Sequence, residues 1–159
     1  MRKKITIVLV DDHAVVRAGV KRLLEQEPIF EVIGEAHSGE TGYQIFGELN
    51  PDVMVMDLSM PGMGGLEAIR RILMRYEKAK ILVLSMHEDL SFANQALKLG
   101  AKGYLIKNAL GDDLVKSIQA IAKGEIFLSD EIAKKIAMHS IASDQDPFYD
   151  LSAREFEVF

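Results

Sequence analysis

Polar residues that could do chemistry together follow several apolar segments of this chain. Asp57 ends the unbroken apolar run at 53–56, a pattern typical of a strand that is covered on both faces. Pro61 and three nearby glycines predict a tight loop directly after it. Other apolar runs are followed by four further polar residues, Asp11, Asp12, Ser85 and Lys107. Because parallel strands bring their carboxyl ends to one edge of a sheet, we expect all five side chains to converge there.

Three carboxylates and one ammonium group in a single pocket favour a bound divalent cation. Like charges repel strongly where water is scarce, and a hard cation relieves that repulsion. Mg²⁺ prefers oxygen ligands and keeps several waters, so it suits this set. Asp57 is then the candidate nucleophile, which would become an aspartyl phosphate. Mg²⁺ and Lys107 would neutralise the charge on the transferred phosphoryl group, and Ser85 would donate a hydrogen bond to it.

Each member of this set also has an ordinary explanation. Asp11 and Asp12 could equally form the N-cap region of the following helix, and the other members carry little information alone. His13 and His87 lie nearby in the sequence. They do not indicate zinc, because no further histidine stands at ligand spacing. The joint pattern is much more specific than any one residue.

The elements that must position these residues alternate regularly along the chain. We expect strands near 5–10, 31–36, 53–57, 80–84 and 104–106. Helices are expected near 14–26, 38–49, 65–76, 89–99 and 111–123. Strand and helix repeated five times predict an α/β fold, a doubly wound five-stranded parallel sheet with helices on both faces. A short mixed segment at 125–128 precedes a sixth, linker helix at about 132–141.

The composition limits the classes of protein to which this chain could belong. The chain has 159 residues, of which 48% are hydrophobic and 27% are charged, as in ordinary globular domains. It has no cysteine, which excludes disulfides and thiolate ligands. The apolar run at 5–10 is too short for a signal peptide, and no run could span a membrane. We therefore expect a cytoplasmic location, and the net charge of −5 argues against this segment wrapping nucleic acid by itself.

The C-terminal residues predict a second domain. Residues 142–150 have the composition of a linker, and Ser152 with Glu155 forms a capping-box pattern. A helix that starts there would extend for only about a turn and a half before Phe159, too short to be stable alone. The expected divisions are an α/β domain at 1–123, a linker with a short helix at 124–150, and the start of a second, truncated domain at 151–159.

Four motifs together resemble one family. They are Val-Asp-Asp-His at 10–13, Met-Asp-Leu-Ser-Met-Pro-Gly-Met-Gly-Gly at 56–65, Leu-Ser-Met at 84–86 and Gly-Ala-Lys-Gly-Tyr-Leu-Ile-Lys at 100–107. Over residues 5 to about 123 the chain resembles the receiver domain of bacterial two-component response regulators. The resemblance implies a flavodoxin-like fold with strand order 2-1-3-4-5. It also implies that Asp57 is the phosphoacceptor.

The same resemblance implies roles for the other site residues. Asp12 and Asp57 would bind Mg²⁺ directly, Asp11 would act mainly through water, and the backbone carbonyl of Ser59 would complete the protein ligands. The phosphoryl group would be held by two side chains, Ser85 and Lys107. Ser85 and Tyr104 resemble the family's switch pair, in which the hydroxyl moves toward the phosphate and the ring turns inward. We expect the responding surface to extend from the fourth strand through the fifth.

The tail narrows the resemblance. Residues 124–129 and 151–155 are similar to those of NarL/FixJ regulators, whose output is a LuxR-type helix-turn-helix. One departure is Asn108, which stands where many receivers have proline directly after the lysine. The implied function is a response regulator that accepts a phosphoryl group from a sensor histidine kinase and controls transcription. DNA would bind only through the missing C-terminal domain, with a homodimer forming on phosphorylation.

Other functions of the same fold are weighed against this one. The chain is not expected to be a stand-alone enzyme, because it would catalyse only its own phosphorylation and dephosphorylation. A phosphatase for external substrates would need a second carboxylate two residues after Asp57, where Ser59 stands. A flavodoxin-like binding module would need a loop rich in Gly, Ser or Thr after the first strand. The remaining alternative is a phosphorylation-independent protein–protein interaction module of the same fold.

Overall fold

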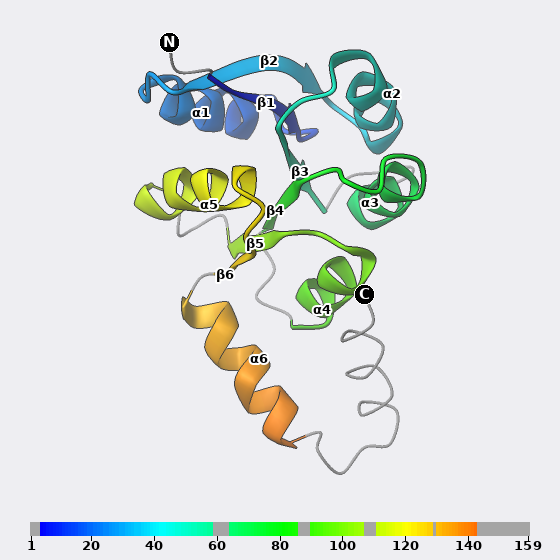
Figure 1. The fold of residues 1–159 in the computed structure, drawn as a ribbon, viewed down its shortest axis with the longest axis vertical. Helices are drawn as coiled ribbons and strands as arrows, with labels where there is room; N and C mark the ends of the chain where they lie inside the picture. The colour runs from blue at the N-terminus through cyan, green and yellow to red at the C-terminus, as the bar shows by residue number, and fades with distance from the viewer. Residues whose placement is uncertain (1–3, 59–63, 86–89, 107–110, 129, 143–159) are drawn as a thin grey trace.

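The structure is a computed structural model that describes residues 4–58, 64–85, 90–106, 111–128 and 130–142. Strands and helices alternate along the chain (Figure 1). The strands are β1 (Ile5–Val10), β2 (Phe30–Ala36), β3 (Val53–Asp57), β4 (Ile81–Ser85), β5 (Gly103–Ile106) and β6 (Phe127–Leu128). The helices are α1 (Ala14–Glu25), α2 (Gly39–Leu49), α3 (Gly64–Arg75), α4 (Leu90–Leu99), α5 (Asp112–Ala122) and α6 (Asp130–Ala142).

All strand pairs are parallel, in the order β2-β1-β3-β4-β5-β6. This confirms the predicted α/β class and the order of the first five strands. The predicted number of five strands is wrong, because β6 adds a sixth at the edge beside β5. Its two residues carry too little pattern to predict a strand. Tertiary packing decides it: Gly103 lets β6 approach, since a Cβ there would lie 2.7 Å from the carbonyl oxygen of Phe127.

Helices cover both faces of the sheet, as Figure 1 shows. Side chains that alternate along β3 enter two separate hydrophobic clusters. Met54 and Met56 pack with residues of α2, α3, α4 and α6. Val53 and Val55 pack with residues of α1 and α5. Because apolar surface is buried on both faces of β3, the strand that ends in Asp57 is held firmly in the centre of the domain.

The ends of α2 illustrate how local sequence sets the helix. The Ser38 side chain caps the N-terminus by accepting a hydrogen bond from the Thr41 backbone N–H at 3.1 Å. At the C-terminus Asn50 adopts a left-handed conformation with φ 46°, which asparagine tolerates better than most residues. Leu49, the last residue of α2, is 38% exposed, whereas Phe46, about one turn earlier, is buried.

The linker segment forms the predicted sixth helix. In α6, Ile132 is fully buried and Ile136 packs against the same cluster as α4. The same spacing continues at His139 or Ser140, whose side chains are not described. The predicted domain boundary near Leu151 also falls outside the described residues. Of the helices that the structure describes, none combines the length and the apolarity needed to cross a bilayer.

Candidate functional site

Three of the predicted site residues lie at the carboxyl ends of adjacent strands. Asp11 directly follows β1, Asp57 ends β3, and Ser85 ends β4. The register pairs Val10 with Met56 and Asp57 with Leu84, so these strand ends are level with one another. All three residues are buried: Asp11 is 6% exposed, Asp57 is 2% exposed and Ser85 is inaccessible. The sequence prediction that strand order would bring these ends together is confirmed.

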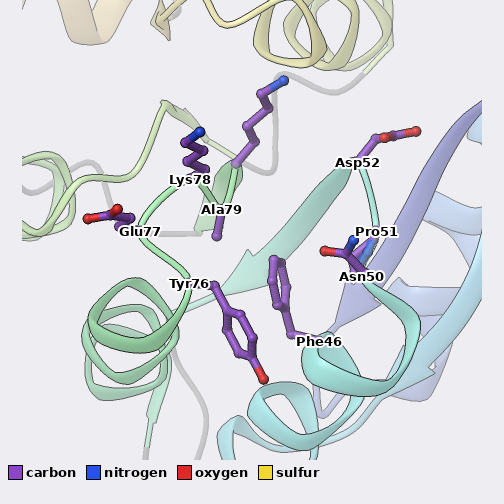
Figure 2. Close-up of a pocket in the computed structure, with 9 residues that line it drawn as sticks. Phe46, Asn50, Pro51, Asp52, Tyr76, Glu77, Lys78 and Ala79 are labelled. Atoms are coloured by element: carbon purple, nitrogen blue, oxygen red, sulfur yellow. The ribbon is translucent and has the colours of Figure 1, made fainter.

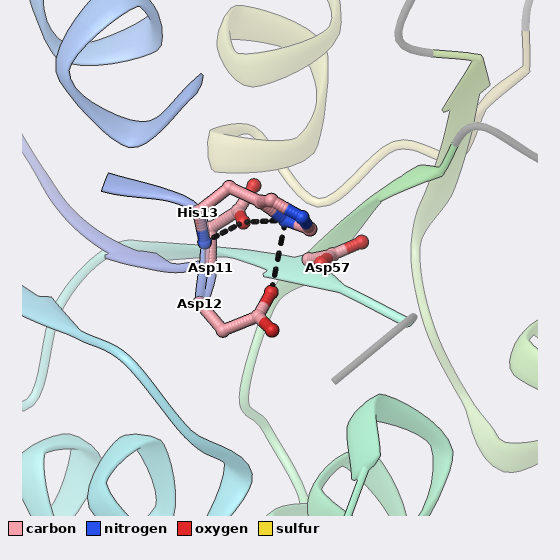
Figure 3. Close-up of side chains that lie close together, drawn as sticks. All are labelled: Asp11, Asp12, His13 and Asp57. Atoms are coloured by element: carbon pink, nitrogen blue, oxygen red, sulfur yellow. Dashed lines mark hydrogen bonds and ion pairs between the residues drawn. The ribbon is translucent and has the colours of Figure 1, made fainter. Parts of the chain in front are cut away.

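The carboxylates form one cluster. Ligand atoms of Asp11, Asp12, His13 and Asp57 all lie within 4.8 Å of one another. Figure 3 shows Asp57 on β3 beside the three residues of the β1–α1 loop. The side chain of Asp12 is 27% exposed, so the cluster opens toward solvent on that side.

The loop that carries Asp11 and Asp12 is shaped by local hydrogen bonds. The Asp11 backbone N–H donates to the carbonyl of Ala36 at 3.0 Å, which extends the β1–β2 ladder by one residue. One carboxylate oxygen of Asp11 accepts a hydrogen bond from the His13 N–H at 2.8 Å, an Asx turn that reverses the chain. His13, rather than an aspartate, occupies the N-cap position of α1, and its side chain makes no capping bond. The alternative explanation, that Asp11 and Asp12 form the N-cap region of α1, is therefore only partly correct. Asp11 shapes the turn before the helix, but the N-cap residue is His13.

His13 belongs to the cluster, although the sequence offered no strong reason to include it. Its Nδ1 lies 3.0 Å from a carboxylate oxygen of Asp12 and 3.4 Å from one of Asp11. The imidazole is 63% exposed and lies on the outer side of the cluster. The only signal in the sequence is its position directly after the two aspartates.

The cluster fits a hard divalent cation. Three carboxylates this close together repel one another where burial lowers the dielectric constant. The buried Oδ1 of Asp12 lies 3.0 Å from Nδ1 of His13, and a cation bound at this oxygen would take the place of that exposed imidazole. The three carboxylates, with one side open to solvent, form an environment in which Mg²⁺ can keep part of its water shell.

The structure describes only some of the other predicted site residues. Ser59 and Lys107 lie outside the described residues. Tyr104, in β5, is fully buried and is the register partner of Val83. Ser85 is two residues further along β4 than Val83, so Ser85 and Tyr104 share one face of the sheet. Their predicted role as a switch pair stays a prediction.

A hollow separate from the acidic cluster lies at the opposite edge of the sheet, where the strands begin. It has a volume of about 420 Å³ and is lined by residues from the ends of α2 and α3 and the starts of β3 and β4. Figure 2 shows Phe46 and Tyr76 in its wall, with ring centroids 5.1 Å apart. One of its two carboxylates, Asp52, accepts hydrogen bonds from the backbone N–H and hydroxyl of Thr6 at 2.9 and 3.1 Å. The hollow is large enough for a small ligand, but the hydrogen bonds of Asp52 are those of structural support.

Comparison with known proteins identifies the family. The model of the response regulator receiver domain matches residues 7–119. The chain belongs to the response regulator receiver domain family. This confirms the resemblance inferred from the four motifs.

Individual relatives agree with this family. The chain is 41% identical over 133 residues to the transcriptional regulatory protein DegU of Brevibacillus brevis, covering 84% of this chain and 56% of DegU. It thus spans little more than half the length of that relative. Among solved structures, a LuxR-family two-component response regulator from Aurantimonas sp. SI85-9A1 is 40% identical with a TM-score of 0.84, covering 87% of this chain and 99% of that one. That similarity confirms the subfamily indicated by the tail.

A more distant similar structure was solved in the presence of a phosphomimetic. The isolated receiver domain of RcsB from Salmonella enterica, solved with the phosphomimetic BeF₃⁻, is 27% identical. Its TM-score is 0.77, and the match covers 83% of this chain and 98% of that one. A second RcsB structure contains two dimers bound to DNA. The receiver domain of this chain is therefore related to regulators of transcription.

Proposed function

We propose that this chain is a phosphoryl-accepting switch in which Asp57 is the phosphoacceptor. The observation that carries the proposal is the cluster itself: a buried Asp57 at the end of the central strand, with Asp11 and Asp12 beside it. Membership of the receiver family and the phosphomimetic complex of RcsB support the same chemistry.

The acidic cluster is the proposed magnesium site. Asp12 and Asp57 would supply carboxylate ligands, the carbonyl of Ser59 would complete the protein ligands, and Asp11 would act through water. When bound, Mg²⁺ neutralises carboxylate charge and the charge that develops on the phosphoryl oxygens. Lys107 adds a second positive charge, and Ser85 donates its hydroxyl hydrogen to a phosphoryl oxygen.

The proposed reaction is a direct transfer to Asp57. A carboxylate oxygen of Asp57 attacks the phosphorus of a phosphohistidine on a sensor kinase. The new O–P bond forms as the P–N bond breaks, and the electron pair of the P–N bond stays on the imidazole nitrogen. Water later attacks the aspartyl phosphate, which restores the carboxylate and releases inorganic phosphate. The chain thus acts only on its own side chain and is not an enzyme for external substrates.

The proposed output runs through the strands beside the site. Ser85 and Tyr104 lie on one face of β4 and β5, and β5 pairs with β6, which leads into α6. The added phosphoryl charge would bias this region between two states. In the cell this would change DNA binding by a C-terminal domain, with a phosphorylated homodimer as the active form. The location proposed for the reaction is the cytoplasm.

Intact-mass spectrometry after incubation with acetyl phosphate tests the proposal. The wild-type chain should gain one phosphoryl group, about 80 Da, only when Mg²⁺ is present. Asp57→Asn should gain none. Asp52→Asn, which changes the carboxylate at the opposite edge of the sheet, is the matched control and should be phosphorylated like the wild type.

Two outcomes would contradict the proposal. A mass gain that persists in Asp57→Asn would place the acceptor elsewhere. No adduct in the wild type, even with a histidine kinase supplied, would favour the phosphorylation-independent interaction module, since that function needs the fold and not the chemistry.

A further inference from the structure

A basic side chain lies directly beneath the acidic cluster. Eight residues line a small cavity there: Leu9, Val10, Asp11, Arg17, Val20, Val55, Asp57 and Leu84. Arg17 is the cation among these eight. It lies in the first turn of α1, and its side chain is only 19% exposed. This partly buried arginine lines the same cavity as Asp11 and Asp57, but the phosphoryl transfer proposed above gives it no role.

Arg17 contacts Asp11 through the backbone. Its Nη1 donates a hydrogen bond to the carbonyl oxygen of Asp11. Its own backbone N–H donates to the carbonyl of His13 at 2.9 Å, which starts the helix. Long helical side chains point back toward the helix N-terminus, so residue 17 is well placed to reach residue 11. The contact therefore follows from the helix geometry of the β1–α1 junction.

The other side of the guanidinium is anchored to β2. Nε of Arg17 donates to Oε1 of Glu35 at 2.9 Å, and Lys21 Nζ lies 3.3 Å from Oε2. Partial burial acts to raise the pKa of Glu35, but the hydrogen bonds from Arg17 and Lys21 outweigh it, so the pKa is lowered. Glu35 is therefore an anion at neutral pH. It holds the arginine fork and offsets a positive charge that would otherwise oppose a cation at the cluster.

Asp11 is consequently held at three points. Its N–H bonds to β2, its carbonyl accepts from Arg17, and one carboxylate oxygen accepts from the His13 N–H. These bonds fix the peptide that joins Asp11 to Asp12, and with it the directions of both carboxylates. Groups behind metal ligands that orient them in this way commonly matter for metal affinity.

We infer that Arg17, anchored by Glu35, is a positioning residue that sets the geometry of Asp11 and Asp12 for magnesium binding. The inference rests on the proposed magnesium site. Arginine suits the role because its planar fork can bond two acceptors at once, whereas lysine offers a single ammonium group. Loss of the fork should loosen the loop and weaken Mg²⁺ binding, while leaving the phosphoryl-transfer step intact once the metal is bound.

Calorimetric titration of the full chain with Mg²⁺ alone tests this inference. Arg17→Met should raise the dissociation constant for Mg²⁺ about tenfold. Arg17→Lys should show a smaller increase, about threefold, because one of the two bonds can be kept. Lys21→Met is the matched control: it removes a cation from the same Glu35 without touching Asp11, and its dissociation constant should match that of the wild type. Thermal unfolding without Mg²⁺ checks that each variant is folded, and Arg17→Lys carries the test if Arg17→Met is not.

The phosphorylation rate with acetyl phosphate separates this inference from the proposed function. At saturating Mg²⁺ the Arg17 variants should reach the wild-type rate, with the loss appearing only at low Mg²⁺. An unchanged dissociation constant in the Arg17 variants, or an equal loss in Lys21→Met, would overturn the inference while wild-type phosphorylation upholds the function. Wild-type Mg²⁺ binding without an adduct would overturn the proposed function alone, and absence of Mg²⁺ binding in the wild type would overturn both.

Discussion

Carboxylates at the two edges of the sheet have opposite electrostatic surroundings. At the edge where the strands begin, Asp52 accepts two hydrogen bonds from Thr6, and its own backbone N–H donates to the Thr6 hydroxyl at 2.9 Å. At the edge where the strands end, Asp11, Asp12 and Asp57 crowd within 4.8 Å of one another and of His13. The charge of Asp52 is stabilised by hydrogen bonds within the protein. The charges of the acidic cluster lie close to one another, where a bound cation could neutralise them.

This difference shows what separates a structural carboxylate from a functional one. A carboxylate with internal donors contributes stability in every state of the protein. A cluster of like charges lowers stability until a cation binds, which is the usual trade-off at sites built for chemistry. The hollow near Phe46 and Tyr76 is the larger opening, yet the electrostatics point to the other edge. Three predictions test this comparison, from the largest expected effect to the smallest.

The first prediction concerns the close contact of α3 with the end of β3. A Cβ on Gly65 would overlap the carbonyl oxygen of Asp57 and lie 2.6 Å from the Cα of Leu58. Because those atoms are backbone, they cannot move aside, and Gly65→Ala should lower the free energy of unfolding by about 3 kcal/mol. Gly64 is the matched control: it has φ +75° and open space around it, so Gly64→Ala should cost only about 1 kcal/mol.

Urea denaturation of both glycine variants measures these losses. Equal losses in the two variants would show that backbone conformation, and not the fit against Asp57, governs this edge of the sheet.

The second prediction compares one substitution at both edges. Asp52→Ala leaves the Thr6 N–H without its acceptor and should lower the free energy of unfolding by about 1–2 kcal/mol. Asp12→Ala removes one charge from the cluster and, without Mg²⁺, should raise the free energy of unfolding by up to about 1 kcal/mol. Thermal unfolding at pH 8 with a chelator should therefore separate the variants in opposite directions from the wild type.

Added Mg²⁺ should then reduce or reverse the difference in stability between the wild type and Asp12→Ala. The wild type gains stability in proportion to metal binding, whereas Asp12→Ala has lost a ligand and should gain much less. If Asp12→Ala were destabilised as much as Asp52→Ala in the presence of the chelator, repulsion among the cluster carboxylates would not lower the stability of the metal-free protein, and the comparison would be wrong.

The third and smallest effect concerns a carboxylate on the exposed face of α3. Hydrogen bonds from Arg70, and next from Arg71, lower the pKa of Glu67 to about 2. Because the folded-state pKa lies below the ordinary value of 4.5, its contribution is complete above pH 4.5 and is lost as the pH falls toward 2. Glu67→Gln should slightly lower the melting temperature at pH 7, and the difference should vanish near pH 2.

Salt provides the control for this surface pair, since exposed ion pairs are screened. The difference between wild type and Glu67→Gln should shrink in 1 M NaCl. A difference that stays constant from pH 7 to pH 2 would mean that packing, and not charge, is responsible.

Much of the fold was predictable because its pattern is local. Apolar runs such as 53–56 and the helical spacing of residues like Ile69 and Ile72 specify elements whatever their neighbours do. Strand–helix alternation then limits the topology, since parallel strands need crossovers of one hand. The strand ends that carry Asp11, Asp57 and Ser85 followed from these rules.

What the sequence by itself determined was therefore the class of fold, the edge at which the acidic residues gather and the family. Tertiary structure alone decided three further features. β6 is a strand only because Gly103 leaves room for it, a contact between residues over twenty positions apart. His13 lies near Asp57 because β1 and β3 pair side by side, and the Arg17 side chain bonds to Glu35 because β2 lies beside β1. Such features depend on distances between elements, which no local pattern encodes.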